Sequence, residues 1–321
     1  MSAAGPEVLV VAPIRPAQME ALGAAYTLHR LDLADAPEAL LAEVGPRVAA
    51  LVTTGSAGVP AGLLPSLPGL RLIATSSVGT DRIDLAACAE RGIVVTNTPD
   101  VLTDDVADLA LGLILATHRR MVAGDAWVRS GDWGREGPFP LTATLTGRRV
   151  GILGLGAIGM AVAERCQAFR MEIGYCSRAP KTVDFAYHAA PIALAGWADI
   201  LVACLPGGAA TRHVIDAGVL AALGPAGALI NVARGSVVDE TALIEALETG
   251  TIATAGLDVF ASEPAPDPRL TALPNVTLYP HHASGTVATR DRMAELVVEN
   301  LAAFFGTGAA LTPVALPVSP A

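Results

Sequence analysis

Five polar residues that can bind anions or move protons each follow a short apolar run in the second half of the chain. They are Arg234, Asp258, Glu263, His281 and His282. If the runs are parallel strands, their carboxyl ends share one edge of a sheet, where open α/β sheets bind ligands. An arginine there can bind a carboxylate, and a histidine beside an acid can deliver a proton. Each residue alone also fits a structural role, so the functional interpretation depends on its neighbours.

A glycine-rich motif supplies that context. Residues 154–159 read Gly-Leu-Gly-Ala-Ile-Gly and stand between an apolar run and a helical segment. In this setting Gly154 permits a tight turn, Gly156 lets a pyrophosphate approach the backbone, and Gly159 lets helix and strand pack closely. The helix N-terminus then faces the phosphates with its N–H groups. The motif indicates a dinucleotide site, and a tight turn without a ligand is the alternative.

The residues after the next strand indicate which dinucleotide is bound. An NAD site typically has Asp or Glu about 20 residues after the motif, where it binds the ribose 2′-hydroxyl. Here that position is Cys176, followed by Ser177 and Arg178. A hydroxyl and a guanidinium suit a 2′-phosphate, so we expect a preference for NADP over NAD. In the alternative, Arg178 is solvated or stacks on adenine, and NAD is used.

A third segment, residues 75–81, lies in the first half of the chain and reads Thr-Ser-Ser-Val-Gly-Thr-Asp. It is typical of a strand end that turns through Gly79 into a loop. Successive N–H groups in such a turn can form an anion-binding nest. An ordinary turn between strand and helix is the alternative.

The remaining pattern predicts the elements that position these residues. Apolar, β-branched runs alternate with Ala/Leu-rich helical segments, which is typical of parallel sheets covered by helices. Strands are predicted at 8–11, 49–53, 72–75 and 93–96, and then at 149–153, 172–175, 200–205, 228–232, 255–259 and 276–279. Two α/β units are therefore expected.

The boundary between the units is expected near Pro99, because proline disfavours helix in the residue before it. Beyond it, Thr103 is expected to cap a helix that continues to about Arg119. Asp104 and Asp105 would lie in its first turn, where the helix dipole favours acids.

Two later segments have distinct patterns. Residues 124–147 are expected to form an excursion, an arm toward another subunit, from which Trp133 or Phe139 would reach a neighbouring site. The last helix, 287–305, is expected to end at Gly306 and to pack back on the first unit.

Composition narrows the class of protein. The chain has 321 residues, of which 52% are hydrophobic and 16% are charged, so disorder and coiled coil are not expected. A formal charge of −10 argues against a nucleic-acid or anionic-membrane partner. The 4 cysteines contain no CxxC pair, which predicts reduced thiols, no zinc site and no disulfide framework. No signal peptide or membrane span is evident, so we expect a cytoplasmic protein.

Taken together, these motifs resemble the D-isomer-specific 2-hydroxyacid dehydrogenase family, in its glyoxylate, hydroxypyruvate and hydroxyphenylpyruvate reductase branch. The resemblance covers residues 72–305 and rests on the segments 77–81, 154–159, 231–240, 256–264 and 280–284. It implies an α/β fold of two doubly wound parallel-sheet domains. A Rossmann-type cofactor domain, 99–286, would be inserted in a flavodoxin-like substrate domain, 1–98 and 287–321. It also implies a homodimer that pairs through the cofactor domain.

The resemblance implies a role for each site residue. Arg234 would bind the carboxylate and carbonyl of a 2-oxo acid. His281 would be the general acid and Glu263 its orienting partner. The backbone N–H groups of Val78 and Gly79 would bind the substrate carboxylate.

The resemblance also implies the residues that contact the cofactor. Asp258 would hold the nicotinamide carboxamide, and His281 would lie beside the ring. Further contacts are expected from Gly154, Gly156, Ala157, Ile158, Gly159, Ser177, Arg178, Leu205, Pro206, Thr211, Val232, Ala233, Ser284 and Gly285. His282 departs from the aliphatic residue that is common in the family, and the motif places the catalytic histidine first.

The implied reaction is the reduction of a small 2-oxo acid by hydride from NADPH, with NAD as an alternative cofactor and no metal. Two other functional interpretations stay open at this point. One is a phosphoglycerate, formate or phosphite dehydrogenase on the same fold. The other is a dinucleotide-sensing module of the corepressor type.

Overall fold

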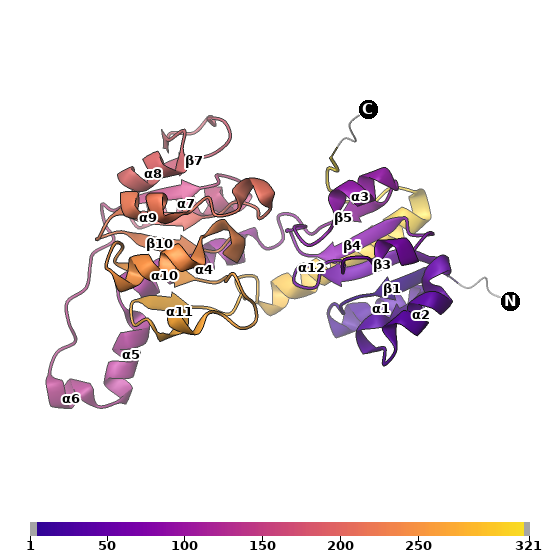
Figure 1. The fold of residues 1–321 in the computed structure, drawn as a ribbon, viewed down its shortest axis with the longest axis horizontal. Helices are drawn as coiled ribbons and strands as arrows, with labels where there is room; N and C mark the ends of the chain where they lie inside the picture. Colours follow the sequence, from indigo (N-terminus) through magenta and orange to yellow (C-terminus); the bar gives the residue numbers. More distant parts are fainter. Residues whose placement is uncertain (1–4, 318–321) are drawn as a thin grey trace. The chain divides into compact units, whose positions relative to one another are not determined.

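The computed structural model describes residues 5–317, and Figure 1 shows the course of the chain. Contacts divide it into two compact units: unit 1 contains Met1–Leu102 and Ser284–Ala321, and unit 2 contains Thr103–Ala283. The expected domain boundaries, 98/99 and 286/287, lie a few residues from these positions. Each unit holds one parallel sheet, so the predicted α/β fold class is confirmed.

The sheet of unit 1 has the order β2-β1-β3-β4-β5, and every neighbouring pair is parallel. Its strands are β1 (Glu7–Val10), β2 (Thr27–Arg30), β3 (Val48–Thr54), β4 (Leu72–Ser76) and β5 (Val94–Thr96). Alternate residues of the central strands enter two separate apolar clusters. Leu9, Leu51 and Ile73 enter one, and Val8, Val52 and Ala74 enter the other. Both faces are therefore buried, as continuous apolar runs predict.

Four helices cover this sheet: α1 (Pro16–Ala25), α2 (Pro37–Val44), α3 (Leu85–Glu90) and α12 (Val287–Thr307). In Figure 1, α12 is the yellow helix that lies with the purple strands, and it packs against β4. The predicted end of this helix at Gly306 is wrong, because its cap is Gly308, with φ at 82°. That left-handed conformation favours glycine, whereas a glycine inside a helix costs only about 1 kcal/mol.

The sheet of unit 2 has the order β12-β11-β10-β9-β6-β7-β8, and its strands are also parallel. The strands are β6 (Arg149–Leu153), β7 (Glu172–Cys176), β8 (Ala186–Tyr187), β9 (Ile200–Ala203), β10 (Ala228–Asn231), β11 (Thr254–Leu257) and β12 (Val276–Leu278). The helices are α4 (Thr103–His118), α5 (Met121–Arg129), α6 (Asp132–Glu136), α7 (Ala157–Ala168), α8 (Pro191–Trp197), α9 (Ala217–Leu223), α10 (Glu240–Glu248) and α11 (Pro268–Ala272).

The structure corrects several details of the predicted elements. The short strands β2 and β8 were not predicted, and β9 ends at Ala203, two residues before its predicted end. Thr103 is the first residue of α4 and not its cap. The segment 124–147, predicted as an excursion without helices assigned to it, contains most of α5 and all of α6. Their apolar side chains Met121, Val122, Val128 and Trp133 are exposed, so the helices lack the buried face that would reveal them.

All four cysteines are free, which confirms the prediction of unpaired thiols. Burial raises the pKa of Cys88 to about 11 and that of Cys166 to about 12. Such thiols stay protonated at neutral pH and are poor nucleophiles. Within residues 5–317, no helix is both long and apolar enough to cross a bilayer.

The packing of α12 on unit 1 gives a stability prediction. Leu301 is fully buried in the cluster that includes Val8 and Ala74. Leu301→Ala should lower the free energy of unfolding by about 2–5 kcal/mol, because it leaves a cavity. Urea unfolding followed by circular dichroism measures the loss. Leu311→Ala is the matched control, since Leu311 is 57% exposed, and an equal loss in both variants would contradict the assigned packing.

Candidate active site

The carboxyl ends of three neighbouring strands bring the predicted polar residues to one edge of the sheet in unit 2. Asn231 of β10 pairs with Leu257 of β11, which pairs with Leu278 of β12. The loops that follow these strands carry Arg234, Asp258 with Glu263, and His281 with His282. The parallel register therefore aligns the starts of the three loops.

The loop after β10 packs closely against the loop after β11 at Gly235. A Cβ at this position would lie 1.9 Å from the carbonyl oxygen of Phe260, so no other residue fits without moving the backbone. The buried side chain of Asn231 fixes the first loop from within. Its Oδ1 accepts from the N–H of Ala233 (3.0 Å) and its Nδ2 donates to the carbonyl of Arg234 (3.0 Å). These contacts hold the base of the Arg234 side chain beside the second loop.

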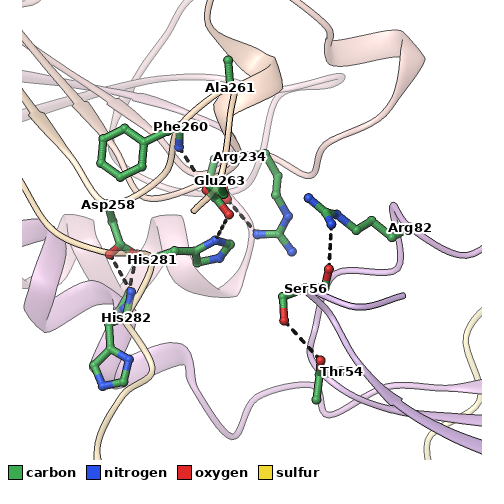
Figure 2. Close-up of polar contacts among 12 residues, drawn as sticks. Thr54, Ser56, Arg82, Arg234, Asp258, Phe260, Ala261, Glu263, His281 and His282 are labelled. Atoms are coloured by element: carbon green, nitrogen blue, oxygen red, sulfur yellow. Dashed lines mark hydrogen bonds and ion pairs between the residues drawn. The ribbon is translucent and has the colours of Figure 1, made fainter. Parts of the chain in front are cut away.

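His281 and Glu263 form the central pair of the site. The imidazole Nδ1 lies 2.7 Å from Oε2 of Glu263, and the N–H of Phe260 donates to Oε1 of the same carboxylate (3.0 Å). Figure 2 shows the carboxylate between these two groups. The His281 side chain is 38% exposed. With Nδ1 engaged by the carboxylate, Nε2 is the nitrogen that can bring a proton to a substrate.

Asp258 fixes the turn that carries His281. Its oxygens accept from the backbone N–H groups of His282 (2.8 Å) and Ala283 (3.2 Å). Its own carbonyl accepts from the N–H of His281 (2.7 Å), which has a left-handed φ of 48°. Burial raises the pKa of Asp258, and the two backbone hydrogen bonds oppose that rise. Because a left-handed φ is unfavourable for histidine, this turn depends on the surrounding hydrogen bonds.

The two adjacent histidines differ in what their side chains contact. The His281 ring contacts the Glu263 carboxylate, whereas the His282 ring lies near Tyr279, with ring centroids 6.4 Å apart. His282 contributes its backbone N–H to Asp258. Of the two rings, the His281 ring is therefore the one that contacts a carboxylate.

The glycine-rich loop between β6 and α7 has the shape that a dinucleotide needs. Gly154 has a left-handed φ of 99°. A Cβ at Gly159 would lie 2.2 Å from the Gly154 carbonyl oxygen, which shows close packing of helix and strand. At Gly156, directly before α7, a Cβ would have no atom within 4 Å, so the backbone there faces open space. Such an opening at a helix N-terminus can accept a pyrophosphate, and Ala157 and Ile158 lie in the first turn of this helix.

The end of β7 presents the groups expected for a 2′-phosphate. Cys176 is the buried last residue of the strand. The Ser177 hydroxyl donates to the carbonyl of Ala179 (2.7 Å). Arg178 is exposed and has no hydrogen bond or ion pair within the described part of the chain. No carboxylate occupies the position that would bind a ribose 2′-hydroxyl.

The other predicted cofactor residues lie in three places. In the loop after β9, which contains Leu205, the Thr211 hydroxyl donates to the carbonyl of Pro206 (2.7 Å). Val232 and Ala233 are buried after β10. The last two, Ser284 and Gly285, belong to unit 1.

In unit 1, the loop after β4 is held through its carbonyl groups. Asn97 Nδ2 donates to the carbonyl of Val78 (2.9 Å), and the N–H of Thr98 donates to that of Ser77 (2.8 Å). Among the backbone hydrogen bonds of residues 5–317, none uses the N–H of Val78 or Gly79. These two N–H groups can therefore bind an anion.

Sequence reasoning missed several residues that shape these loops. Asn231 and Gly235 determine how closely the loop after β10 approaches the loop after β11. For Asn231, an amide side chain at the end of an apolar strand was the feature of the sequence that could have indicated this role. In unit 1, Arg82 donates to the carbonyl of Ser56 (2.6 Å), whose hydroxyl lies 3.2 Å from that of Thr54. Nothing in their spacing along the chain indicated this contact. Within the described residues, no group of three or more His, Cys, Asp or Glu is arranged to hold a metal ion.

Comparisons with known proteins agree with this geometry. A family model described as D-isomer specific 2-hydroxyacid dehydrogenase, NAD binding domain, matches residues 111–283. A hydroxyphenylpyruvate reductase from Plectranthus scutellarioides is 47% identical over 308 residues, covering 96% of this chain and 98% of that protein. A 2-ketogluconate reductase from Gluconobacter oxydans is 42% identical over 310 residues, covering 96% and 98%.

A solved structure is similar over nearly the whole chain. It is an NADPH-dependent glyoxylate/hydroxypyruvate reductase from Sinorhizobium meliloti in complex with NADP and malonate. Its TM-score is 0.92 at 47% sequence identity, with 97% of each chain covered. The chain therefore belongs to the D-isomer-specific 2-hydroxyacid dehydrogenase family.

Proposed function

We propose that this protein reduces a small 2-oxo acid to the D-2-hydroxy acid and prefers NADPH. The observation that carries the proposal is the 2.7 Å contact between His281 and Glu263, at the same sheet edge as Arg234. The relatives named above are reductases of hydroxyphenylpyruvate, 2-ketogluconate, glyoxylate and hydroxypyruvate. None of them is a phosphoglycerate, formate or phosphite dehydrogenase or a corepressor, so those alternatives are not favoured.

The residues of this chain divide the work of the reduction. A nicotinamide dinucleotide bound at the glycine loop supplies the hydride. Nε2 of His281 donates the proton that the carbonyl oxygen of the substrate acquires. Glu263 orients the ring through Nδ1. Arg234 provides fixed positive charge for the substrate carboxylate and the developing alkoxide.

We propose that exposed apolar side chains of α5, α6 and the segment after them pack against a second copy of the chain. They are Met121, Val122, Val128, Trp133 and Leu141. Phe139 packs within its own chain. Its ring centroid lies 5.9 Å from that of Trp127 and 5.5 Å from the guanidinium carbon of Arg120. Trp133, which is 63% exposed, is therefore the better candidate to reach a neighbouring subunit.

We also propose that the protein is located in the cytoplasm, where free thiols persist.

The substrate class is tested by initial rates with glyoxylate, hydroxypyruvate and phenylpyruvate, each with NADPH and with NADH. We expect NADPH oxidation with at least one acid, and the acid that is reduced fastest shows the size of substrate that the protein prefers. Turnover with none of the six pairs would contradict the proposed reaction.

The proton-donor role predicts a large effect of His281→Ala. Turnover should fall by about 10²–10⁴-fold, since a positioned general acid contributes that much. NADPH binding, followed by fluorescence titration, should persist. His282→Ala is the matched control, because its ring does not meet Glu263. If His282→Ala were the more damaging change, the assignment of the proton donor would be wrong.

The proposed 2′-phosphate site predicts a selective effect of Arg178→Ala. The kcat/KM with NADPH should fall by about 10–100-fold, the cost of one charged hydrogen-bonded contact. The kcat/KM with NADH should change little, because NADH has no 2′-phosphate. Equal losses with both cofactors would mean that Arg178 acts on structure rather than on cofactor choice.

A further inference from the structure

The loop that carries Glu263 is held by burial only at its start. Phe260 is buried in the core of unit 2, whereas Ala261 and Ser262 are exposed and Glu263 is only partly buried. Exposed loop residues of this kind depend on hydrogen bonds for their conformation. The distance between Glu263 and His281 therefore depends on what fixes residues 261–263.

Two successive N–H groups at the start of this loop each bind a carboxylate. The N–H of Phe260 donates to Oε1 of Glu263 (3.0 Å), which closes the loop on itself. The N–H of Ala261 donates to Oε2 of Glu240 (2.9 Å), which lies 21 residues earlier in the chain. Glu240 thus provides the second attachment, and it comes from outside the loop.

The position of Glu240 is itself rigid. It is the first residue of α10, whose inner face buries Leu243, Ile244 and Leu247. The preceding residue, Asp239, caps the helix by accepting from the N–H of Ala242 (3.2 Å). A carboxylate at the start of a buried, capped helix can serve as a fixed point for a more exposed loop.

We propose that Glu240 is a positioning residue for the reduction. By holding the N–H of Ala261, it sets the orientation of Glu263 and, through Glu263, that of the His281 ring. This inference rests on the roles proposed above for Glu263 and His281. It adds a third carboxylate that acts without touching the substrate, and its mode of action is hydrogen-bond acceptance rather than charge.

Four variants test whether Glu240 acts as a hydrogen-bond acceptor or through its charge. Glu240→Ala removes the acceptor, Glu240→Gln keeps an oxygen at the same reach without charge, and Glu240→Asp keeps the charge on a shorter side chain. The charge must be controlled for, because Glu240 acts electrostatically on Arg269, whose ion pair is with Asp267. Glu245→Ala is the matched control, since Glu245 is an exposed glutamate on the same helix.

For each variant we would measure kcat, KM for the 2-oxo acid, the Kd for NADPH and the midpoint of thermal unfolding. Glu240→Ala and Glu240→Asp should lower kcat by about 10-fold, as is typical when an outer partner of an active group is lost. Glu263→Gln, which removes the carboxylate that contacts His281, should lower kcat in the same direction. Glu240→Gln and Glu245→Ala should match the wild type, and NADPH binding should be unchanged throughout.

The outcomes distinguish this inference from the proposed function. If Glu263→Gln itself left kcat unchanged, the proposed role of Glu263 would fail and this inference with it. If Glu263→Gln were impaired while Glu240→Ala and Glu240→Asp matched the wild type, only the inference would fail. Impaired Glu240→Gln beside normal Glu240→Asp would overturn it in favour of a charge effect. If Glu240→Ala does not fold, the comparison of the Gln and Asp variants decides the question alone.

Discussion

The approach of Gly235 to the carbonyl of Phe260 is the contact on which the polar site depends. A side chain at position 235 would collide with the backbone of Phe260. The loop after β10 and the loop after β11 can meet only because one of them has no Cβ at this point. Arg234 directly precedes this contact and Glu263 follows it by three residues, so their placement requires this close approach as well as the hydrogen bonds of Asn231 and Phe260.

Three carboxylates in unit 2 act through different partners. Asp258 is buried, and both of its carboxylate oxygens accept hydrogen bonds from the turn that carries His281. Burial raises the pKa of Asp258. Glu263 is partly exposed and meets the imidazole. Glu240 holds the backbone of the intervening loop. The same side-chain chemistry therefore serves a turn, a ring and a loop, and the local burial and donors decide which role each acid has.

Both units show why parallel sheets suit such a site. Strands buried on both faces leave only their ends for polar residues, and all carboxyl ends lie at the same edge. In unit 2 this edge carries the glycine loop as well as the loops of Arg234, Glu263 and His281. The groups proposed to bind a dinucleotide and those proposed to transfer a proton thus arise from one sheet.

The sequence by itself determined the strands that are buried on both faces and the glycine loop, because apolar continuity and a required left-handed turn are local properties. It also identified Arg234, Glu263 and His281 as candidates. It did not reveal α5 and α6, whose apolar side chains are exposed, nor that the last helix passes through Gly306. Only the tertiary structure decided which groups meet. His281 and Glu263 are 18 residues apart, and Glu240 and Ala261 are 21 apart. Such pairs form only when β10, β11 and β12 align in parallel register, and no local pattern records the contacts between their loops.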